Sequence, residues 1–543
     1  MRSAPCSGHV PFFITGNLAA SADAAHTGRR SSRAPMFQSS SNKQPLLGEQ
    51  PEDPFRWLRL LATVISVSLG SSLQFGFATG SLNNLSDIVP ATLAAAGNPI
   101  SIAQWAFINS CFSIGGLIGS YGVVVPLALL GRKKTLLLAN VFVFMSSAFM
   151  WYGTVWWVLV LGRICVGVVA GVAQMVAGSY MTEISPIGIR GSVGVCSQVG
   201  IVIGIAFANF LTQPSFHIFG SMEKWRYTFL VPSLFSLFQL AVLPWCPESP
   251  SYLIKAKGSS TTLATLRALH RELSAAAHLS NLRQEVQEGG KAGDDMSVWE
   301  LLRTSSLRKQ VLVGIVIKIG VQVRAQFSFG AIRTRKIFGA QFSETPTPHG
   351  AQFSGIDAIF YYSTLMFTQA KVADPQLATT LLSLVNLAMT FIAMGIMEKA
   401  GRRALIMVTW VGMCSGFFTI FLASTGVEAL GIQGSLLPNL EVLAMVCIII
   451  CFAVGVGNVE GFIISEIMPV YAKDTLMSIG QPLNWIANLT VSTLFPILFV
   501  AMGRYAYLIF VALTAFFGWF TYTKLPETKG RTIAQVTEEF KRY

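Results

Sequence analysis

Long apolar segments recur along the chain, with short polar stretches between them. Twelve of them approach the roughly 20 residues that an α-helix needs to cross a bilayer. They lie near 58–77, 103–130, 135–157, 158–182, 193–212, 227–246, 311–369, 377–397, 404–425, 440–465, 476–500 and 504–524. The segment at 311–369 is interrupted by charged residues. The pattern predicts an all-α membrane protein with twelve transmembrane helices.

Three short polar motifs occur twice, each time at the end of an apolar segment. The octet Glu183–Arg190 returns as Glu466–Lys473. Gly131–Lys134 and Pro247–Ser249 have later counterparts in Gly401–Arg403 and Pro526–Thr528. Internal duplication in a membrane protein is typical of transporters. We therefore expect two pseudo-symmetric halves of six helices, at 57–250 and 311–525.

Three segments lie outside the two halves. Residues 1–56 mix Ser, Arg, Pro and Gly and predict a disordered cytoplasmic tail. Residues 251–310 carry leucines at helical spacing among charged residues, which predicts a linker of amphipathic helices on the cytoplasmic face. Residues 526–543 are expected to form a cytoplasmic C-terminal tail.

The basic residues predict the orientation in the membrane. The chain is 52% hydrophobic and 12% charged, with a formal net charge of +13. Lys and Arg gather in the loops of one face, which the positive-inside rule makes cytoplasmic. Both termini are then cytoplasmic, and we expect a multi-pass protein of the plasma membrane. The positive charge needs no nucleic-acid partner to explain it.

The sequence contains few motifs for bound ligands or covalent modifications. The eight cysteines are scattered, with neither a disulfide framework nor metal-ligand spacing. We expect no cofactor, no metal and no enzymatic activity. Asn84, in Asn84-Leu85-Ser86, is a candidate glycosylation site on the outer side.

An ordered set of motifs resembles one known family. The set comprises Leu73–Phe77, Glu183–Gly191, Phe353–Ser363, Asn484–Trp485 and Pro526–Gly530. Over roughly 57–540 the chain resembles the sugar porters, the hexose branch of the major facilitator superfamily. The resemblance implies the twelve-helix major facilitator fold and transport of a monosaccharide by alternating access between its two halves.

Polar side chains in mid-membrane are costly, so each is a candidate ligand contact. The candidates for the sugar site are Gln198, Gln322, Gln352, Asp357, Asn386, Asn484 and Asn488. Amides and a carboxylate suit sugar hydroxyls, which both donate and accept hydrogen bonds. By resemblance, Gln198, Gln352, Asn386 and Asn484 match sugar-contacting positions, and Tyr361 and Tyr362 belong to an outer gate. The alternative is that the amides only join helices.

Charged residues at the inner ends of the helices form a second group. It consists of Arg132, Arg163, Glu183, Arg190, Arg402, Arg403, Glu466 and Lys473. Topology explains the basic members but not the two glutamates. We therefore expect an inner gate of ion pairs that break when the cytoplasmic side opens.

One departure from the family pattern bears on the coupling mechanism. Proton-coupled relatives carry an Asp where this chain has Ala78, which favours a uniporter working by facilitated diffusion. One alternative is a proton symporter using Asp357 or Glu460. Another is a sugar sensor that does not transport. Sensors of this family tend to have a long cytoplasmic extension, whereas only thirteen residues follow Gly530 in this sequence (543 − 530). Gly461 replaces the family's sugar-stacking Trp, so the sequence does not identify the sugar.

Residues 323–351 do not fit the seventh helix. They bring Arg324, Arg333, Arg335 and Lys336 to a depth where each charge costs about 2.5–3.5 kcal/mol. Joining Gln322 to Gln352 restores an apolar helix and the family's paired glutamines. We therefore interpret the segment as an insertion foreign to the fold, against the alternative of an extruded loop in the outer vestibule.

Overall fold

A computed structural model gives the structure of the protein. It describes residues 55–186, 189–269, 275–276, 278–280, 282–283, 298–304, 307–322, 364, 367, 374–397, 399–429, 436–468, 470–502, 505–529, 531 and 533–542. Residues 1–54 of the predicted tail (1–56) and the predicted insertion at 323–351 lie outside these residues. So do the candidate site residues Gln352, Asp357, Tyr361 and Tyr362.

The N-terminal half contains six membrane-crossing segments. The first is continuous through α1 (Arg56–Val67), the π-helix η1 (Ser68–Ser72) and α2 (Leu73–Gly80). The next four are α4 (Ile102–Gly122), α5 (Val124–Tyr152), α6 (Trp156–Ile184) and α7 (Arg190–Thr212). The sixth combines η4 (Trp225–Leu230), α8 (Val231–Val242) and η5 (Leu243–Trp245).

The C-terminal half repeats this order. Its helices are α13 (Arg308–Gln322), α15 (Pro375–Met397), α16 (Arg402–Ala429), α17 (Leu436–Val454), α18 (Val456–Ile467), α19 (Val470–Met502) and α20 (Ala506–Lys524). The helices α17 and α18 meet at Gly455 and form one crossing. Of the seventh crossing, the structure describes α13 and, further along the chain, the helical residues Thr364 and Phe367.

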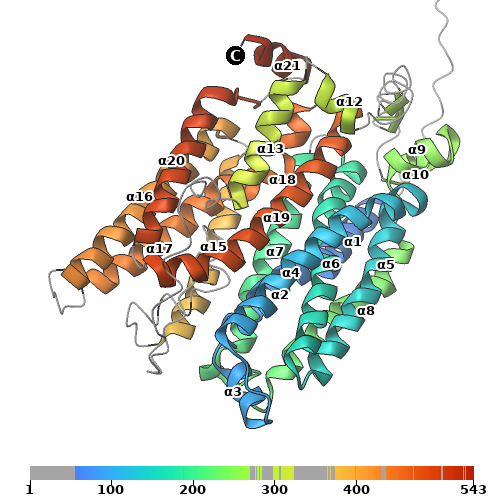
Figure 1. The fold of residues 1–543 in the computed structure, drawn as a ribbon. Helices are drawn as coiled ribbons and strands as arrows, with labels where there is room; N and C mark the ends of the chain where they lie inside the picture. The colour runs from blue at the N-terminus through green and yellow to red at the C-terminus, as the bar shows by residue number, and fades with distance from the viewer. Residues whose placement is uncertain are drawn as a thin grey trace, which may run out of the picture. The chain divides into compact units, whose positions relative to one another are not determined.

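The helices stand side by side in one bundle (Figure 1). Nine helical segments among the described residues are long and apolar enough to cross a membrane. The three other predicted crossings contain α4, α13 and α19. The prediction of an all-α membrane protein with two six-helix halves is confirmed.

Short helices cap the two ends of the bundle. The helix α3 (Ile88–Ala95) and the 3₁₀ turn η3 (Pro214–Phe216) belong to loops at one end. At the other end lie α9 (Pro250–Ala256), α10 (Ser259–Leu269), α12 (Val298–Arg303) and α21 (Ile533–Arg542) (Figure 1). The C-terminal segment therefore contains a helix, whereas the sequence pattern predicted only a tail. Val536 and Phe540 of α21 are buried, so this helix is docked.

Glycines let helices of the N-terminal half approach closely. A Cβ atom at Gly76 of α2 would lie 1.8 Å from the carbonyl oxygen of Ile201 on α7. One at Gly115 of α4 would lie 2.1 Å from the carbonyl oxygen of Ile164 on α6. Small residues permit such packing where burial of apolar surface gives no drive between helices in lipid. These close contacts determine how the helices that carry the candidate site residues pack together.

Candidate functional site

The repeated motifs of the N-terminal half meet at the end of its helices that is predicted to be cytoplasmic. Nη2 of Arg132 lies 3.2 Å from Oε1 of Glu183, and the side chains are 13% and 15% exposed. Oγ of Ser249 donates a hydrogen bond to Oε2 of Glu183. The backbone N–H of Lys133 donates to the carboxylate of Glu248 at 3.1 Å. The cluster ties α5 and α6 to the segment after η5.

The C-terminal half builds the same cluster. Nη2 of Arg402 lies 3.1 Å from Oε1 of Glu466. Oγ1 of Thr528 donates to Oε2 of Glu466 at 2.5 Å, and the backbone N–H of Arg402 donates to Glu527 at 2.7 Å. Arg403 donates to the backbone carbonyl of Tyr522. Each of these two ion pairs joins helices of one half.

The remaining members of the predicted inner gate differ in status. The side chains of Arg190 and Lys473 lie outside the described residues. Arg163 does not belong to the group, and its placement there was wrong. Because Glu183 lies at the C-terminal end of α6, where the cluster forms, Arg163 lies twenty residues (183 − 163) away, towards the opposite end of the helix. That distance is about 30 Å along a helix.

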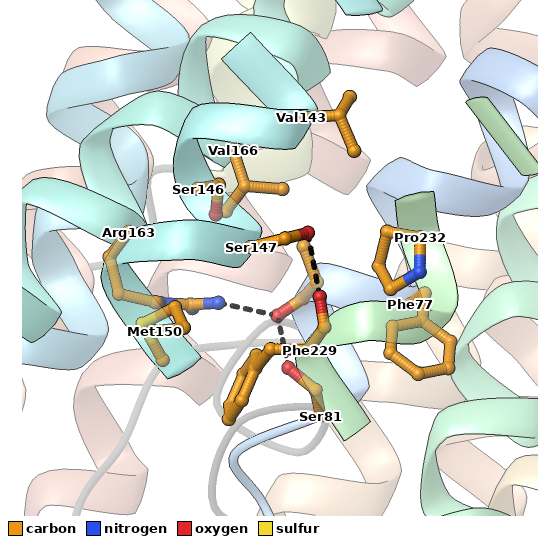
Figure 2. Close-up of a pocket in the computed structure, with 11 residues that line it drawn as sticks. Phe77, Ser81, Val143, Ser146, Ser147, Met150, Arg163, Val166, Phe229 and Pro232 are labelled. Carbon is orange, nitrogen blue, oxygen red and sulfur yellow. Dashed lines mark hydrogen bonds between the residues drawn. The ribbon is translucent and has the colours of Figure 1, made fainter. Parts of the chain in front are cut away.

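Arg163 instead borders a small cavity inside the N-terminal half. Its Nη1 donates to the carbonyl oxygen of Ala78 at 2.7 Å, and its guanidinium lies 4.9 Å from the ring centroid of Phe112. Figure 2 shows Arg163 beside this cavity, with Ser81 and Ser147 nearby. The cavity holds about 20 Å³, enough for one water molecule and too small for a sugar.

A cluster of hydrogen-bonded polar side chains lies where α13, α18 and α19 meet α6. Nζ of Lys318 binds Oε1 of Glu460 at 2.9 Å and Oε1 of Gln481 at 3.2 Å. Nε2 of Gln481 donates to Oε1 of Gln174. Nδ2 of Asn484 donates to the backbone carbonyl of Lys318 at 3.2 Å. The group thus contains one predicted site residue, Asn484, and one hydrogen bond that connects the halves, from Gln481 to Gln174.

Three members of this group were not predicted as site residues. Lys318, Gln481 and Gln174 stand within apolar helices, where their polarity was the available signal. The sequence indicated Glu460 only as the proton carrier of the alternative symport mechanism. Their mutual contacts depend on how four helices are rotated, which the sequence does not reveal.

Trp485 is a further residue whose position was not anticipated. It belongs to α19 and is 2% exposed. Its ring centroid lies 5.8 Å from that of Phe75 and 5.5 Å from that of Phe112, both in the N-terminal half. Next to it, Oγ of Ser113 donates to Oδ1 of Asn488. The helix α19 is therefore joined to α4 by apolar and polar contacts.

Asn386 has an unusual environment for a buried amide. It is 1% exposed on α15, and neither Oδ1 nor Nδ2 has a hydrogen-bond partner among the described residues. Most buried polar groups are hydrogen-bonded, so such a group calls for an explanation. Gln198 is half-buried on α7, which packs against α15. The side chain of Gln322 lies outside the described part of the chain.

Polar contacts also connect the halves at the end of the bundle that is predicted to face outwards. Nδ2 of Asn84 donates to the carbonyl of Asn209 at 3.0 Å and to Oγ1 of Thr380 at 3.4 Å. Oγ1 of Thr364 donates to Oδ1 of Asn84 at 3.1 Å. Asn84 is only 1% exposed. This burial contradicts a glycosylation site at Asn84, because glycan attachment needs an accessible amide nitrogen.

Comparison with known proteins agrees with this architecture. A family model described as "Sugar (and other) transporter" matches residues 63–337 and 346–540. Its gap, 338–345, falls inside the predicted insertion. The chain is 30% identical to the facilitated glucose transporter member 3 of Homo sapiens over 501 residues, which cover 88% of this chain and 92% of that protein. The Mus musculus protein of the same name is also 30% identical, with the same two coverages.

Solved structures show the same fold. The proton:xylose symporter XylE bound to 6-bromo-6-deoxy-D-glucose aligns with a TM-score of 0.69 at 21% identity, covering 89% of this chain and 100% of that one. A partially occluded inward open conformation of XylE from E. coli aligns with a TM-score of 0.67 at 20% identity, covering 88% of this chain and 100% of that chain. The chain therefore belongs to the sugar transporter family of the major facilitator superfamily.

Proposed function

We propose that this protein carries a monosaccharide, a hexose, across a membrane by facilitated diffusion with alternating access. The observation that carries the proposal is the buried amide of Asn386, whose donor and acceptor are both unused among the described residues. A sugar hydroxyl can donate to Oδ1 and accept from Nδ2. A bound sugar would thus supply the hydrogen bonds that the amide lacks.

The remaining predicted contacts complete this proposal. Gln198 would bind from α7, and Asn484 and Asn488 from α19. The pair Gln322 and Gln352, with Asp357, would contribute from the seventh helix. Tyr361 and Tyr362 would close the site from outside. Amides distributed over both halves suit a ligand whose hydroxyl groups point in every direction.

Alternating access needs contacts that form and break at each face. The clusters around Glu183 and Glu466 would stiffen the cytoplasmic end of each half, and Arg190 and Lys473 would complete an inner gate. The bonds of Asn84 to Thr364 and Thr380 would act as the outer counterpart. We place the protein in the plasma membrane, with both termini in the cytoplasm.

Facilitated diffusion is supported by Ala78 and by the named function of the human relative. Symport through Asp357 or Glu460 and sugar sensing without transport are the competing functions. Uptake of labelled hexoses and pentoses into cells that lack their own sugar transporters, with and without a protonophore, separates them. We expect uptake that the protonophore leaves unchanged. Uptake that the protonophore abolishes would establish symport, and absence of uptake would favour a sensor.

A further inference from the structure

Lys318 and Glu460 form an ion pair inside the C-terminal half. Their side chains are 4% and 16% exposed, with 2.9 Å between Nζ and Oε1. Lys318 stands ten residues (318 − 308) into α13, which corresponds to about 15 Å from its cytoplasmic end. Well-packed apolar residues often stabilise such a position as well as an ion pair does. Stability alone therefore does not account for the pair.

The pair determines how the amide of Gln481 is oriented. An ammonium group only donates hydrogen bonds, so Lys318 must face Oε1 of Gln481, 3.2 Å away. This leaves Nε2 of Gln481 as the donor towards the N-terminal half. There it donates to Oε1 of Gln174 on α6. A second, longer contact of 3.5 Å reaches Oδ1 of Asn484.

The hydrogen bond between the halves lies on the cytoplasmic side of Asn484. The helix α19 starts at Val470, near the cytoplasmic cluster of Glu466, and reaches Gln481 three residues before Asn484. Three residues correspond to about 4.5 Å along the helix axis. Separating the two halves at their cytoplasmic ends would therefore pull Gln481 away from Gln174.

We propose that Gln481 and Gln174 form a latch that holds the inner side of the empty transporter closed, and that Lys318, paired with Glu460, is the residue that positions Gln481 for it. The proposal rests on alternating access, part of the proposed function, but not on which sugar is carried. Loss of one hydrogen bond should shift the equilibrium between inner-closed and inward-open forms about two- to tenfold.

Hydrogen–deuterium exchange of the full-length protein in lipid nanodiscs, without sugar, tests the latch. In Gln481→Leu and in Gln174→Leu we expect faster exchange in the cytoplasmic segments 176–184 and 470–480. We expect slower exchange in the outer segments 81–88 and 212–222, because opening inside closes the outside. Faster exchange on both faces would indicate general destabilisation and overturn the proposal, as would an unchanged pattern.

A double-mutant cycle tests the positioning role of Lys318. The variant Lys318→Met with Glu460→Leu removes both charges, so neither is left buried and unpaired. We expect it to shift exchange in the same direction as Gln481→Leu. Adding Gln481→Leu to it should change little further, since both act on one bond. Additive effects would show that the ion pair does not act through Gln481. Sugar uptake, measured separately, keeps this result distinct from a failure of the proposed function.

Discussion

Glu183 and Glu466 occupy equivalent positions in the two halves, each accepting hydrogen bonds from an arginine and a hydroxyl group of its own half. Their partners are Arg132 and Ser249 in one case and Arg402 and Thr528 in the other. The repeated octets thus fold into repeated clusters. Because each cluster links elements of a single half, it can keep that half rigid while the halves move against each other.

The first prediction concerns the stability of these clusters. Glu466→Gln removes the negative charge that faces Arg402, and hydrogen bonds to charged groups contribute about 1.5–3 kcal/mol. We expect a lower midpoint of thermal unfolding for the purified protein. Glu539→Gln is the control, because the pair of Glu539 with Arg531 is 29% and 36% exposed and such pairs contribute about 0–1 kcal/mol. Equal midpoints for the two variants would contradict the role given to Glu466.

The second prediction separates binding from folding at Asn386. Asn386→Ala removes a buried amide that has no partner among the described residues, so stability without sugar should not fall. The sugar loses its hydrogen bonds to this amide, and each lost bond should weaken binding by about 0.5–1.5 kcal/mol. The KM of uptake should therefore rise severalfold. Gln198→Ala should also raise KM.

The control for both substitutions is Ser415→Ala. Ser415 is exposed on α16, and its hydroxyl bonds the carbonyl oxygen of Gly412 in the same helix. Its removal should change neither KM nor stability. Normal uptake kinetics in Asn386→Ala and Gln198→Ala would remove both residues from the site.

Three sequence-based expectations show what local patterns can and cannot reveal. The equivalence of Glu183 and Glu466 was predictable because it resides in contiguous motifs. The predicted position of Arg163 in the inner gate was wrong, because the depth of a residue in the membrane depends on the direction in which its helix, α6, crosses. The burial of Asn84 escaped the sequon pattern because the segment after α2 turns back towards Asn209 and Thr380.

The third prediction follows from the burial of Asn84. When the protein is produced in a eukaryotic host, we expect no glycan on Asn84 that an N-glycosidase could remove. The variant Asn84→Gln should therefore have the same electrophoretic mobility as the unsubstituted protein. Because Asn84→Gln also disturbs bonds to Thr364 and Thr380, we expect it to alter uptake. A glycan found on Asn84 by mass spectrometry would contradict the buried position.

The fourth prediction concerns residues 323–351. Deleting them joins Gln322 to Gln352 and leaves a continuous apolar seventh helix without Arg324, Arg333, Arg335 and Lys336. We expect the deletion variant to reach the membrane in greater amount than the full chain and to transport sugar. Abundant native peptides from this segment in a transport-competent protein would show that it belongs to the fold.

Facilitated diffusion is tested most directly by the steady-state distribution of a transported hexose across liposomes that contain the purified protein, with an imposed proton gradient. A site without a proton-carrying carboxylate at Ala78 predicts equal sugar concentrations inside and outside, reached faster than in protein-free liposomes. Asn386→Ala should slow this equilibration at low sugar concentration. Accumulation above the outside concentration, lost in Asp357→Asn or in Glu460→Gln, would contradict facilitated diffusion and establish proton-coupled transport.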